Sequence, residues 1–332
     1  MTTPTTPADA GQEPPGRRPP SAAPGVSSRR RRLRTVLAVL AALVALLCVD
    51  ATLVSARVGE LDVDLRPDGD GTTWVLVGLD SRERLPAGAA VEDFGSPQDV
   101  PGSRADVIVV VHRTADGVAG ALSIPRDLVV RSGGITAGRL ALTWLDGPGA
   151  TADALCTLGI PVDHLVAVDL AGFASVVDAV GGLDLDVAAA VRDPAAGLLL
   201  PSAGPQHVDG ATALALVRSR HPERRVGDDW VPVPVDPDGR ASAAGTVLSA
   251  LTDAVHGSVV RPWRLQRIAW AASGAVTVDP GTSVADLISL ARADVGEVAV
   301  LPVSAPVGST IARVATDETT AAVAAAGLAC ER

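Results

Sequence analysis

An apolar stretch directly behind a run of arginines is the feature that most constrains this chain of 332 residues. The arginines lie within residues 29–34, and residues 35–54 contain Asp50 as their single charged side chain. A helix needs about 20 mostly apolar residues to cross a bilayer. The sequence therefore predicts a membrane-spanning helix near the N-terminus.

The arginine run also predicts how this helix is oriented. Basic residues flanking a membrane span remain on the cytoplasmic side. We therefore expect a single-pass protein of the cell membrane, with a cytoplasmic N-terminus and an extracytoplasmic domain. The alternative is a cleaved signal peptide, since Val54-Ser55-Ala56 resembles a signal peptidase site. Both interpretations place the folded domain outside the membrane.

Charge is distributed unevenly along the chain. Residues 1–34 contain seven Arg against Asp9 and Glu13, a net charge of +5, whereas the remainder contains 21 Arg against 36 acidic residues, a net charge of −15. Contacts with phosphates supply most of the affinity of nucleic-acid-binding proteins. So acidic a domain is not expected to bind nucleic acid, and any anionic ligand must be held by a local arginine cluster.

The residue types that are missing exclude several kinds of chemistry. All 28 basic residues are arginine, and lysine, asparagine and tyrosine are absent. Without lysine there is neither a Schiff base nor a P-loop. Three Cys and five His, with no CxxC or HExxH motif, leave little for a zinc site with several protein ligands.

Apolar patterning predicts strands that alternate with helices, which is typical of an α/β fold with helices covering a sheet. The Pro-rich stretch 226–238 is expected to be an irregular loop. The predicted strands are Trp74–Leu79, Val107–His112, Val118–Ile124 and His164–Leu170, and the predicted helices are Thr151–Leu158, Ala171–Val180, Ala211–Val217, Ala241–Val255 and Val284–Arg292.

These patterns divide the chain into five parts. The predicted parts are a disordered cytoplasmic tail (1–34), a transmembrane anchor (35–56), a linker (57–72), a folded domain (73–305) and a C-terminal tail (306–332).

Arginine and aspartate gather at the ends of these predicted elements. Arginine suits a pyrophosphate because its planar fork donates two parallel hydrogen bonds. Two aspartates at strand ends could hold a Mg²⁺ that keeps part of its water shell. The alternative is ordinary surface ion pairing. The clusters are Asp80-Ser81-Arg82, Arg104-Ala105-Asp106, Pro125-Arg126-Asp127, Arg218-Ser219-Arg220-His221 and Gly239-Arg240.

An ordered set of motifs resembles the LytR-CpsA-Psr family across roughly residues 73–300. The turn His207-Val208-Asp209-Gly210 agrees as well. The motifs are Val-Leu-Val-Gly-Leu-Asp-Ser-Arg (75–82), Ser-Arg-Ala-Asp-Val-Ile (103–108), Ser-Ile-Pro-Arg-Asp (123–127), Ala-Gly-Phe-Ala-Ser-Val-Val-Asp-Ala-Val-Gly-Gly-Leu (171–183) and Ala-Leu-Val-Arg-Ser-Arg-His (215–221).

This resemblance implies a mixed central sheet flanked by helices and an extracytoplasmic phosphotransferase. Such enzymes move a glycopolymer from a polyprenyl-pyrophosphate carrier to peptidoglycan, with polyprenyl phosphate as the other product. Asp80 and Asp106 would bind Mg²⁺, and Asp127 would orient Arg126 or assist proton removal from the acceptor hydroxyl. The residues expected to grip the pyrophosphate are Arg82, Arg104, Arg126, Arg218, Arg220 and Arg240.

One departure from the family pattern concerns the long helix. Arg-Gln usually follows three and four residues after the Arg of the Gly-Arg pair, but Ala243 and Ala244 stand there. Arg224 or Arg225 could substitute from the neighbouring loop. The resemblance therefore leaves two interpretations, an active phosphotransferase or a weakened or inactive member that still binds a lipid pyrophosphate.

Two cysteines are candidates for a disulfide, and one histidine is a further candidate site residue. Cys156 and Cys330 both lie beyond the anchor, in an oxidising compartment, where they could form a disulfide or remain free thiols. His221 lies in an arginine cluster, whereas the other histidines are scattered along the chain and are expected to be structural or surface residues rather than ligands.

Overall fold

The computed structural model describes residues 26–66, 70–86, 98, 101–132, 136–233, 239–258 and 261–330. The chain divides into two units, Met1–Thr52 and Leu53–Arg332. Helix α1 (Val26–Ser55) forms the described part of the first unit and ends just inside the second. Its segment Arg30–Ser55 is long and apolar enough to cross a membrane.

Helix α1 begins earlier than the sequence analysis predicts. The predicted disordered tail extends to residue 34, but residues 26–34 are helical and include the arginine run. No proline or glycine lies between Val26 and the apolar stretch, and arginine is a good helix former. The helix can therefore continue into the charged segment.

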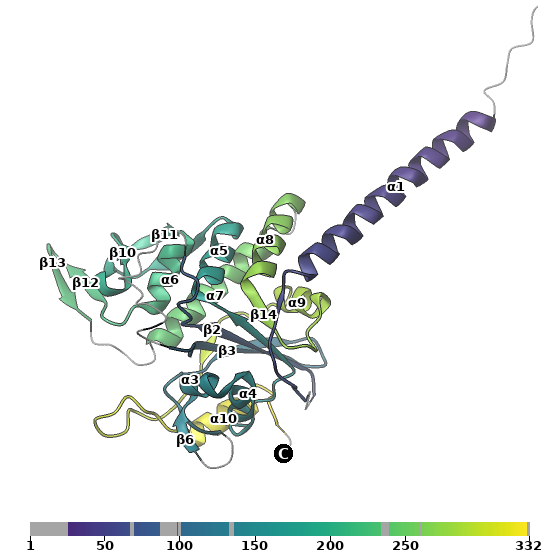
Figure 1. Ribbon diagram of the computed structural model, residues 1–332. Helices are drawn as coiled ribbons and strands as arrows, with labels where there is room; N and C mark the ends of the chain where they lie inside the picture. Colours follow the sequence, from purple (N-terminus) through teal and green to yellow (C-terminus); the bar gives the residue numbers. More distant parts are fainter. Residues whose placement is uncertain are drawn as a thin grey trace, which may run out of the picture. The chain divides into compact units, whose positions relative to one another are not determined.

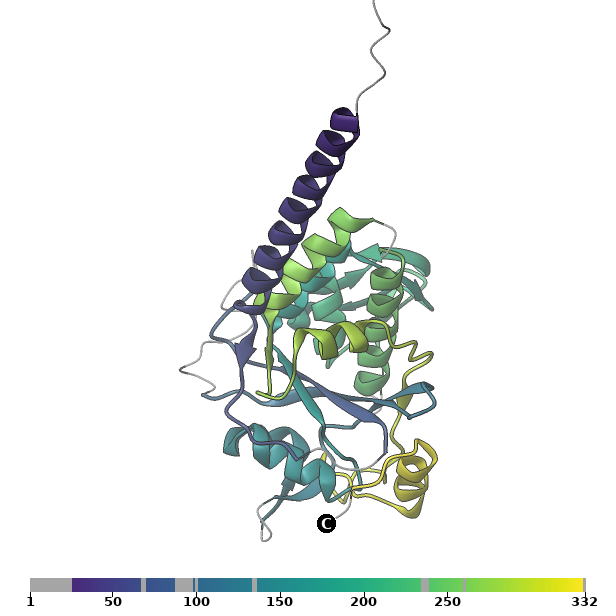
Figure 2. The ribbon, with the colours of Figure 1, turned by 90° about the vertical axis from the view of Figure 1, so that its right-hand side faces the viewer.

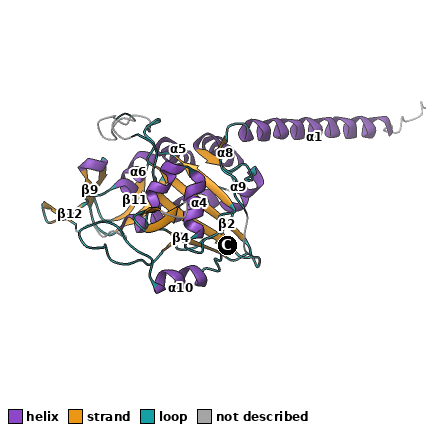
Figure 3. Cartoon of the chain, turned by 60° about the horizontal axis from the view of Figure 1, so that its bottom comes forward, coloured by secondary structure: helices purple, strands orange, loops and turns teal. Residues whose placement is uncertain are grey.

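A seven-stranded mixed sheet forms the centre of the second unit, as the family resemblance implies (Figure 3). Strand β2 (Thr72–Leu79) pairs in parallel with β7 (His164–Val168) and antiparallel with β3 (Ala105–Arg113). From edge to edge the order is β1 (Gly59–Glu60), β14 (Val276–Val278), β7, β2, β3, β4 (Ala119–Ser123) and β15 (Ala299–Val300). The four strands predicted from the sequence are all present in this sheet.

Strand β3 shows why this sheet is covered on both faces. Successive side chains of a strand point to opposite faces. Ile108 and Val110 belong to one apolar core, whereas Val109 and Val111 pack with Trp74 in another. The nearly continuous β-branched sequence of this strand is typical of a strand buried on both sides.

Helices cover these two faces (Figures 1 and 2). The first core contains Leu140, Leu155 and Val323, and the second is completed by Leu248 and Leu290. These residues come from α3 (Leu140–Thr143), α4 (Pro148–Cys156) and α10 (Asp317–Ala325) on the first face, and from α7 (Gly239–His256) and α9 (Val284–Ala291) on the second.

A third core lies beside the sheet, between helices and short strands. Helix α5 (Leu170–Val180) follows its N-cap residue Asp169, whose side chain accepts a hydrogen bond from Gly172 N. It ends at Gly181, which adopts φ +99°. The other helices are α6 (Gly210–Arg218), α7 and α8 (Pro262–Ala275). The short strands of the unit are β5 (Val129–Ser132), β6 (Thr136–Arg139), β8 (Leu183–Val187), β9 (Val191–Asp193), β10 (Leu198–Leu200), β11 (Gly204–Val208), β12 (Glu223–Val226) and β13 (Asp229–Pro232).

The prediction of an irregular loop over 226–238 is wrong for its first half. Strands β12 and β13 form an antiparallel hairpin in which Val226 faces Asp229. Gly227 adopts φ +62° at the turn, a conformation that favours glycine. Residues 234–238 lie outside the described residues.

The predicted linker and C-terminal tail are parts of the fold. In the linker, β1 pairs with β14, and Leu61 and Leu65 pack on the first core. In the tail, α10 supplies Val323 to the same core. A disulfide between Cys156 and Cys330 joins the tail to α4, so the two cysteines are paired rather than free. A single short element whose partner is distant in the sequence gives no periodic signal. For this reason the sequence pattern did not show that the linker and the tail belong to the folded domain.

Candidate functional site

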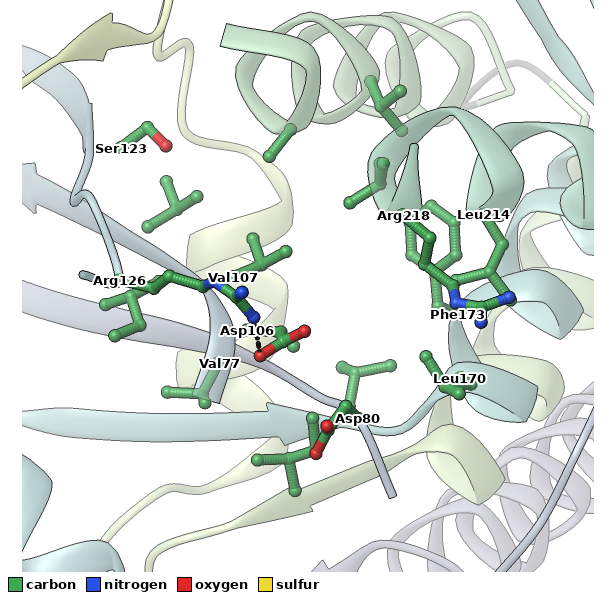
Figure 4. Close-up of a pocket in the computed structure, with 18 of the residues that line it drawn as sticks. Val77, Asp80, Asp106, Val107, Ser123, Arg126, Leu170, Phe173, Leu214 and Arg218 are labelled. Carbon is green, nitrogen blue, oxygen red and sulfur yellow. Dashed lines mark hydrogen bonds and ion pairs between the residues drawn. The ribbon is translucent and has the colours of Figure 1, made fainter. Parts of the chain in front are cut away.

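A pocket of about 470 Å³ opens where β2 and β3 meet α5, α6 and α7 (Figure 4). This volume lies within the range of about 300–1,000 Å³ usual for small-molecule sites. Arg126 and Asp106 lie on one side of the pocket, and Arg218 and Phe173 lie on the other. Its apolar wall includes Val77, Val107, Val109, Ile124, Leu170, Phe173, Leu214, Val217, Val247, Leu248 and Leu251.

The ends of β2 and β3 bring two predicted aspartates into this pocket. The pairing of the strands is irregular between Gly78 and Leu79, where β2 ends. Asp80 N then donates a hydrogen bond to Arg104 O (3.1 Å), and Arg104 N donates back to Asp80 Oδ1 (2.7 Å). The strand ends therefore hold Asp80 beside the start of β3, close to Asp106.

Asp106 is clamped by two guanidinium groups that come from different parts of the fold. Arg126 Nη1 donates to Oδ1 of Asp106, and Arg220 Nη2 donates to Oδ2 at 3.2 Å. Arg126 follows β4, whereas Arg220 follows α6. The carboxylate thus links the two sides of the pocket and holds both cations in it.

Asp127 is arranged to orient Arg126. It is buried, with Oδ2 lying 3.8 Å from Arg126 Nε and Oδ1 accepting a hydrogen bond from Arg139 Nη1 at 3.1 Å. Both carboxylate oxygens of Asp127 therefore face guanidinium groups. Of the two roles considered for Asp127, this geometry favours orientation of Arg126.

Arg82 places a partly buried cation in the pocket wall. Within the described part of the chain, its Nη1 atom is buried and has no hydrogen-bond partner. A buried guanidinium nitrogen without a partner is costly in the free protein. An anionic ligand in the pocket could supply the missing acceptor.

The turn after α6 carries Arg220 and His221 and is fastened by Asp193, which is fully buried. Its Oδ2 accepts hydrogen bonds from Ser219 Oγ, Arg220 N and His221 N, each at 2.8 Å. Burial alone raises the pKa of Asp193, but these hydrogen bonds, with that of His221 N foremost, outweigh burial and lower the pKa. The charged carboxylate therefore fixes the position of this arginine-bearing turn.

The two aspartates at the strand ends fit a weakly ligated divalent cation. Burial raises the pKa of Asp80, and the charge of Asp106 adds to this effect, against the Arg104 N–H and the nearby guanidinium groups. The described residues contain no group of three or more His, Cys, Asp or Glu that could hold a metal. Mg²⁺, however, commonly uses one or two carboxylates together with substrate phosphates and water. These donors therefore fit Mg²⁺ rather than a metal that requires a closed protein cage.

The pocket brings together seven of the nine predicted site residues. Arg104 is held against Asp80 and is not part of the pocket lining. Arg240 lies in the first turn of α7, but its side chain falls outside the described residues. The lining residues among those predicted are Asp80, Arg82, Asp106, Arg126, Asp127, Arg218 and Arg220.

Arg224 and Arg225 do not substitute for the family's Arg-Gln pair in this structure. They lie on β12 and do not line the pocket, and Arg225 faces Asp228 at 3.6 Å. Ala244 is buried and lines the pocket, so that an apolar methyl group occupies the place of a polar side chain.

The structure adds two polar residues that the sequence analysis missed. One is Asp193. The only local sign of its role in the sequence is that Pro194 follows it, a pair that often begins a turn. The other is Arg313, which lines the pocket and is 5% exposed. Its N donates to Asp127 O (3.0 Å) and its O accepts from Val129 N (2.7 Å), so the C-terminal segment runs beside the Arg126–Asp127 turn. A single arginine in the predicted tail carries no signal for this placement.

Comparisons with known proteins match this sequence and this fold. Residues 52–293 match the sequence model of the LytR_cpsA_psr family. The chain is 35% identical over 228 residues to the probable cell wall biosynthesis protein LcpB of Corynebacterium glutamicum, covering 67% of this chain and 52% of LcpB. It is 30% identical over 172 residues to the polyisoprenyl-teichoic acid–peptidoglycan teichoic acid transferase TagV of Bacillus subtilis, covering 49% of this chain and 41% of TagV. The chain thus spans about half the length of the curated relatives that it matches.

Solved structures agree with the sequence matches. The LytR-Csp2A-Psr enzyme from Actinomyces oris is 33% identical and superimposes with a TM-score of 0.69, covering 82% of this chain and 97% of that structure. The B. subtilis TagV structure shares the fold at 22% identity and a TM-score of 0.56, over 78% of this chain and 96% of TagV. Since the family model covers well over half of the residues, the chain belongs to the LytR_cpsA_psr family.

Proposed function

We propose that this protein transfers a glycopolymer from a polyprenyl-pyrophosphate carrier to peptidoglycan. The observation that supports this best is one pocket that unites an apolar wall with the side chains of Arg82, Arg126, Arg218 and Arg220. Isoprenoid pyrophosphates combine a long apolar chain with a compact, highly charged group, and the pocket offers surfaces for both. The names of the relatives LcpB and TagV support the assignment to cell-wall assembly.

Charge stabilisation is the main contribution expected from the protein in this reaction. The acceptor hydroxyl oxygen would attack the phosphorus next to the polymer, while the bond from this phosphorus to the bridging oxygen breaks. Polyprenyl phosphate leaves, and the polymer becomes joined to peptidoglycan through a phosphodiester. Guanidinium groups on both sides of the pocket would bind the phosphate oxygens and the negative charge that moves to the leaving group.

The carboxylates would keep these cations in place and could also hold a metal. Asp106 holds Arg126 and Arg220, and Asp127 orients Arg126. Mg²⁺ bound by Asp80 and Asp106 would neutralise part of the pyrophosphate charge. The acceptor proton would pass to solvent, since the described pocket places Asp127 between two guanidinium groups.

We further propose a single-pass location in the cell membrane, with the N-terminus in the cytoplasm and the domain outside. The apolar helix and the preceding arginines support this topology. The Cys156–Cys330 disulfide also supports it, because disulfides persist mainly in oxidising compartments.

A reconstituted transfer reaction tests the proposed function. The full chain in vesicles would receive a polyprenyl-pyrophosphate-linked glycopolymer and peptidoglycan fragments, with Mg²⁺ or with a chelator. We expect polymer on peptidoglycan and polyprenyl phosphate in equal amounts, and only with Mg²⁺. Polymer that binds to the protein but stays on the lipid would contradict transfer.

Arg313 is expected to contribute to binding of the carrier. Arg313→Gln should weaken affinity for the lipid pyrophosphate by about 10- to 100-fold, the loss typical of one charge-assisted hydrogen bond. Equilibrium binding of a fluorescent polyprenyl pyrophosphate measures this effect. Arg131→Gln is the matched control, because Arg131 lies on adjacent β5 but is exposed and outside the pocket lining. Equal losses for both variants would argue against a role for Arg313.

A second candidate function is binding of a lipid pyrophosphate with little or no transfer, and Ala244 in the pocket wall favours it. Ala243→Arg/Ala244→Gln would restore the family pattern. If the missing side chains limit turnover, phosphate release from geranyl pyrophosphate should rise by about 10-fold or more, as expected for at least one recovered charge-assisted contact. A double variant no more active than the wild type would count against this explanation.

A further inference from the structure

Helix α8 presents two large aromatic side chains to solvent in a chain that has very few. Trp263 is 71% exposed and Trp270 is 45% exposed, although the chain contains only five Trp and two Phe. Trp263, Gln266, Arg267 and Trp270 are all exposed and follow the i, i+3, i+4, i+7 spacing of one helix face. We call these four residues the tryptophan face.

Helix α8 and its N-cap residue, which carry the tryptophan face and its Arg267, are basic within an acidic domain. Residues 261–275 contain three arginines and no acidic residue, whereas the chain from residue 35 onward has a net charge of −15. An acidic domain is repelled by an anionic surface, except where it presents a basic face. Charge complementarity therefore favours an anionic partner for this face.

Chain connectivity places the tryptophan face near the predicted membrane exit. Helix α1 ends at Ser55, and the Arg57 guanidinium stacks on the Trp270 ring at 4.2 Å from the ring centroid. Gly274 permits this approach, since a Cβ there would lie 2.5 Å from Arg57 Nη2. Two residues span at most about 7 Å, so Trp270 remains close to the point at which the apolar helix ends.

Tryptophan and arginine together are typical of the headgroup region of a bilayer. The indole ring has an apolar body and an N–H donor, and it is enriched at membrane interfaces. Arginine is attracted by anionic headgroups and can extend its charged end to them. We propose that the tryptophan face of α8 docks on the anionic phospholipid surface of the membrane that α1 spans, an inference that rests on the proposed membrane anchoring.

This contact would present the pocket to a carrier that remains in the bilayer. Helix α8 packs tightly on α5, where a Cβ at Gly172 would lie 2.8 Å from Ala275 O (Figure 1). Helix α5 in turn supplies Leu170 and Phe173 to the pocket wall. Docking through α8 therefore places the apolar pocket one helix away from the lipid headgroups.

Tryptophan quenching tests the proposal on the full chain. Helix α1 contains no tryptophan, so all emission comes from residues beyond the anchor. The chain would be inserted into vesicles of phosphatidylcholine and phosphatidylglycerol that carry a 5-doxyl lipid. We expect strong quenching of the wild type and at least a twofold smaller effect for Trp263→Phe/Trp270→Phe. Trp230→Phe is the matched control, because Trp230 lies on β13 against Arg192, and it should keep the wild-type quenching.

Three results would overturn the proposal. The first is equal quenching in the wild type and the double variant, and the second is quenching that does not depend on phosphatidylglycerol. The third is an intermolecular cross-link that the double variant abolishes while the wild type shows no quenching, which would assign the face to a second copy of the chain.

Turnover separates this proposal from the proposed function. Neither tryptophan lines the pocket, so the double variant should hydrolyse soluble geranyl pyrophosphate at the wild-type rate while its use of a long carrier in vesicles falls about fivefold or more. Quenching without turnover on either substrate would contradict the function and leave the docking surface supported. Turnover without quenching would contradict the docking surface alone.

Discussion

Replacing Arg82 by alanine is expected to lower kcat/KM for the polyprenyl-pyrophosphate substrate by about 100- to 1,000-fold, as for other preorganised groups that stabilise transition-state charge. The same change should leave the free energy of unfolding unchanged or slightly higher. The combination is unusual, because most substitutions that damage a buried site also destabilise the protein.

The physical reason lies in the surroundings of Arg82. Its Nη1 atom is buried in the pocket wall and lacks a hydrogen-bond partner among the described residues. The guanidinium therefore costs free energy in the ligand-free protein, and alanine removes this cost. In the complex, the same atom would donate a charge-assisted hydrogen bond to a phosphate oxygen, and alanine cannot replace it.

Arg84→Ala is the matched control for this prediction. Arg84 lies two residues further along the chain, is largely exposed, and pairs with Asp169 at 2.8 Å without lining the pocket. Its replacement should change kcat/KM by less than about threefold, consistent with the small worth of exposed ion pairs. Steady-state kinetics and urea unfolding of the three proteins give both quantities. An Arg82→Ala enzyme that loses stability but keeps its turnover would contradict the proposed role.

The fold was predictable from the sequence where apolar patterning is long and regular. Strands β2, β3, β4 and β7 and helices α5, α6 and α7 lie close to their predicted ranges. The residues of β3 illustrate the reason, because a continuous β-branched run suits a strand covered on both faces. The unpredicted strands β9, β10, β12 and β13 have only three or four residues each. So few residues carry too little periodicity to be distinguished from loops.

The candidate site was predictable for a related reason. The Arg and Asp clusters stand where regular elements end, and the pairing of β2 with β3 brings Asp80 and Asp106 together. Arg313 was not predictable, because its place beside Asp127 depends on backbone hydrogen bonds between segments far apart in the sequence. The tail in which it lies is also fixed by a disulfide to Cys156, and spacing alone did not decide whether that bond forms.

Asp193→Asn is expected to have the second large effect on stability and turnover. Asp193 is a positioning residue that acts through Arg220 and does not itself contact the substrate. We expect the variant to lose about 2–4 kcal/mol of unfolding free energy, since several hydrogen bonds to a buried charge are impaired together. Turnover should fall by about 10- to 100-fold because Arg220 and its turn are displaced.

Donor and acceptor chemistry explains why even an isosteric amide fails. Both carboxylate oxygens of Asp193 accept hydrogen bonds, Oδ1 from Ala195 N and Oδ2 from Ser219 Oγ and the N–H groups of Arg220 and His221. Asparagine must place an NH₂ group at one of these positions, where it would face N–H donors that cannot reverse their role. The loss should therefore appear in kcat and in stability together.

The pH dependence of stability provides an independent readout for Asp193. Its pKa is lower in the folded state than in the unfolded chain, because the hydrogen bonds to the carboxylate outweigh the effect of burial. The resulting stabilisation is complete above the unfolded Asp pKa of about 3.9 and is lost as the pH falls through the lower folded pKa. The stability difference between wild type and Asp193→Asn should therefore be largest near neutral pH and shrink in acid.

Asp184→Asn provides the comparison for this last prediction. Asp184 pairs with His207 at 2.7 Å, but its side chain is 89% exposed, so its replacement should cost less than about 1 kcal/mol. Urea unfolding of both variants between pH 3 and pH 7, together with kcat at neutral pH, measures the predicted effects. If Asp193→Asn keeps the wild-type kcat, the turn does not depend on this carboxylate, and the position of Arg220 must be set by its ion pair with Asp106 instead.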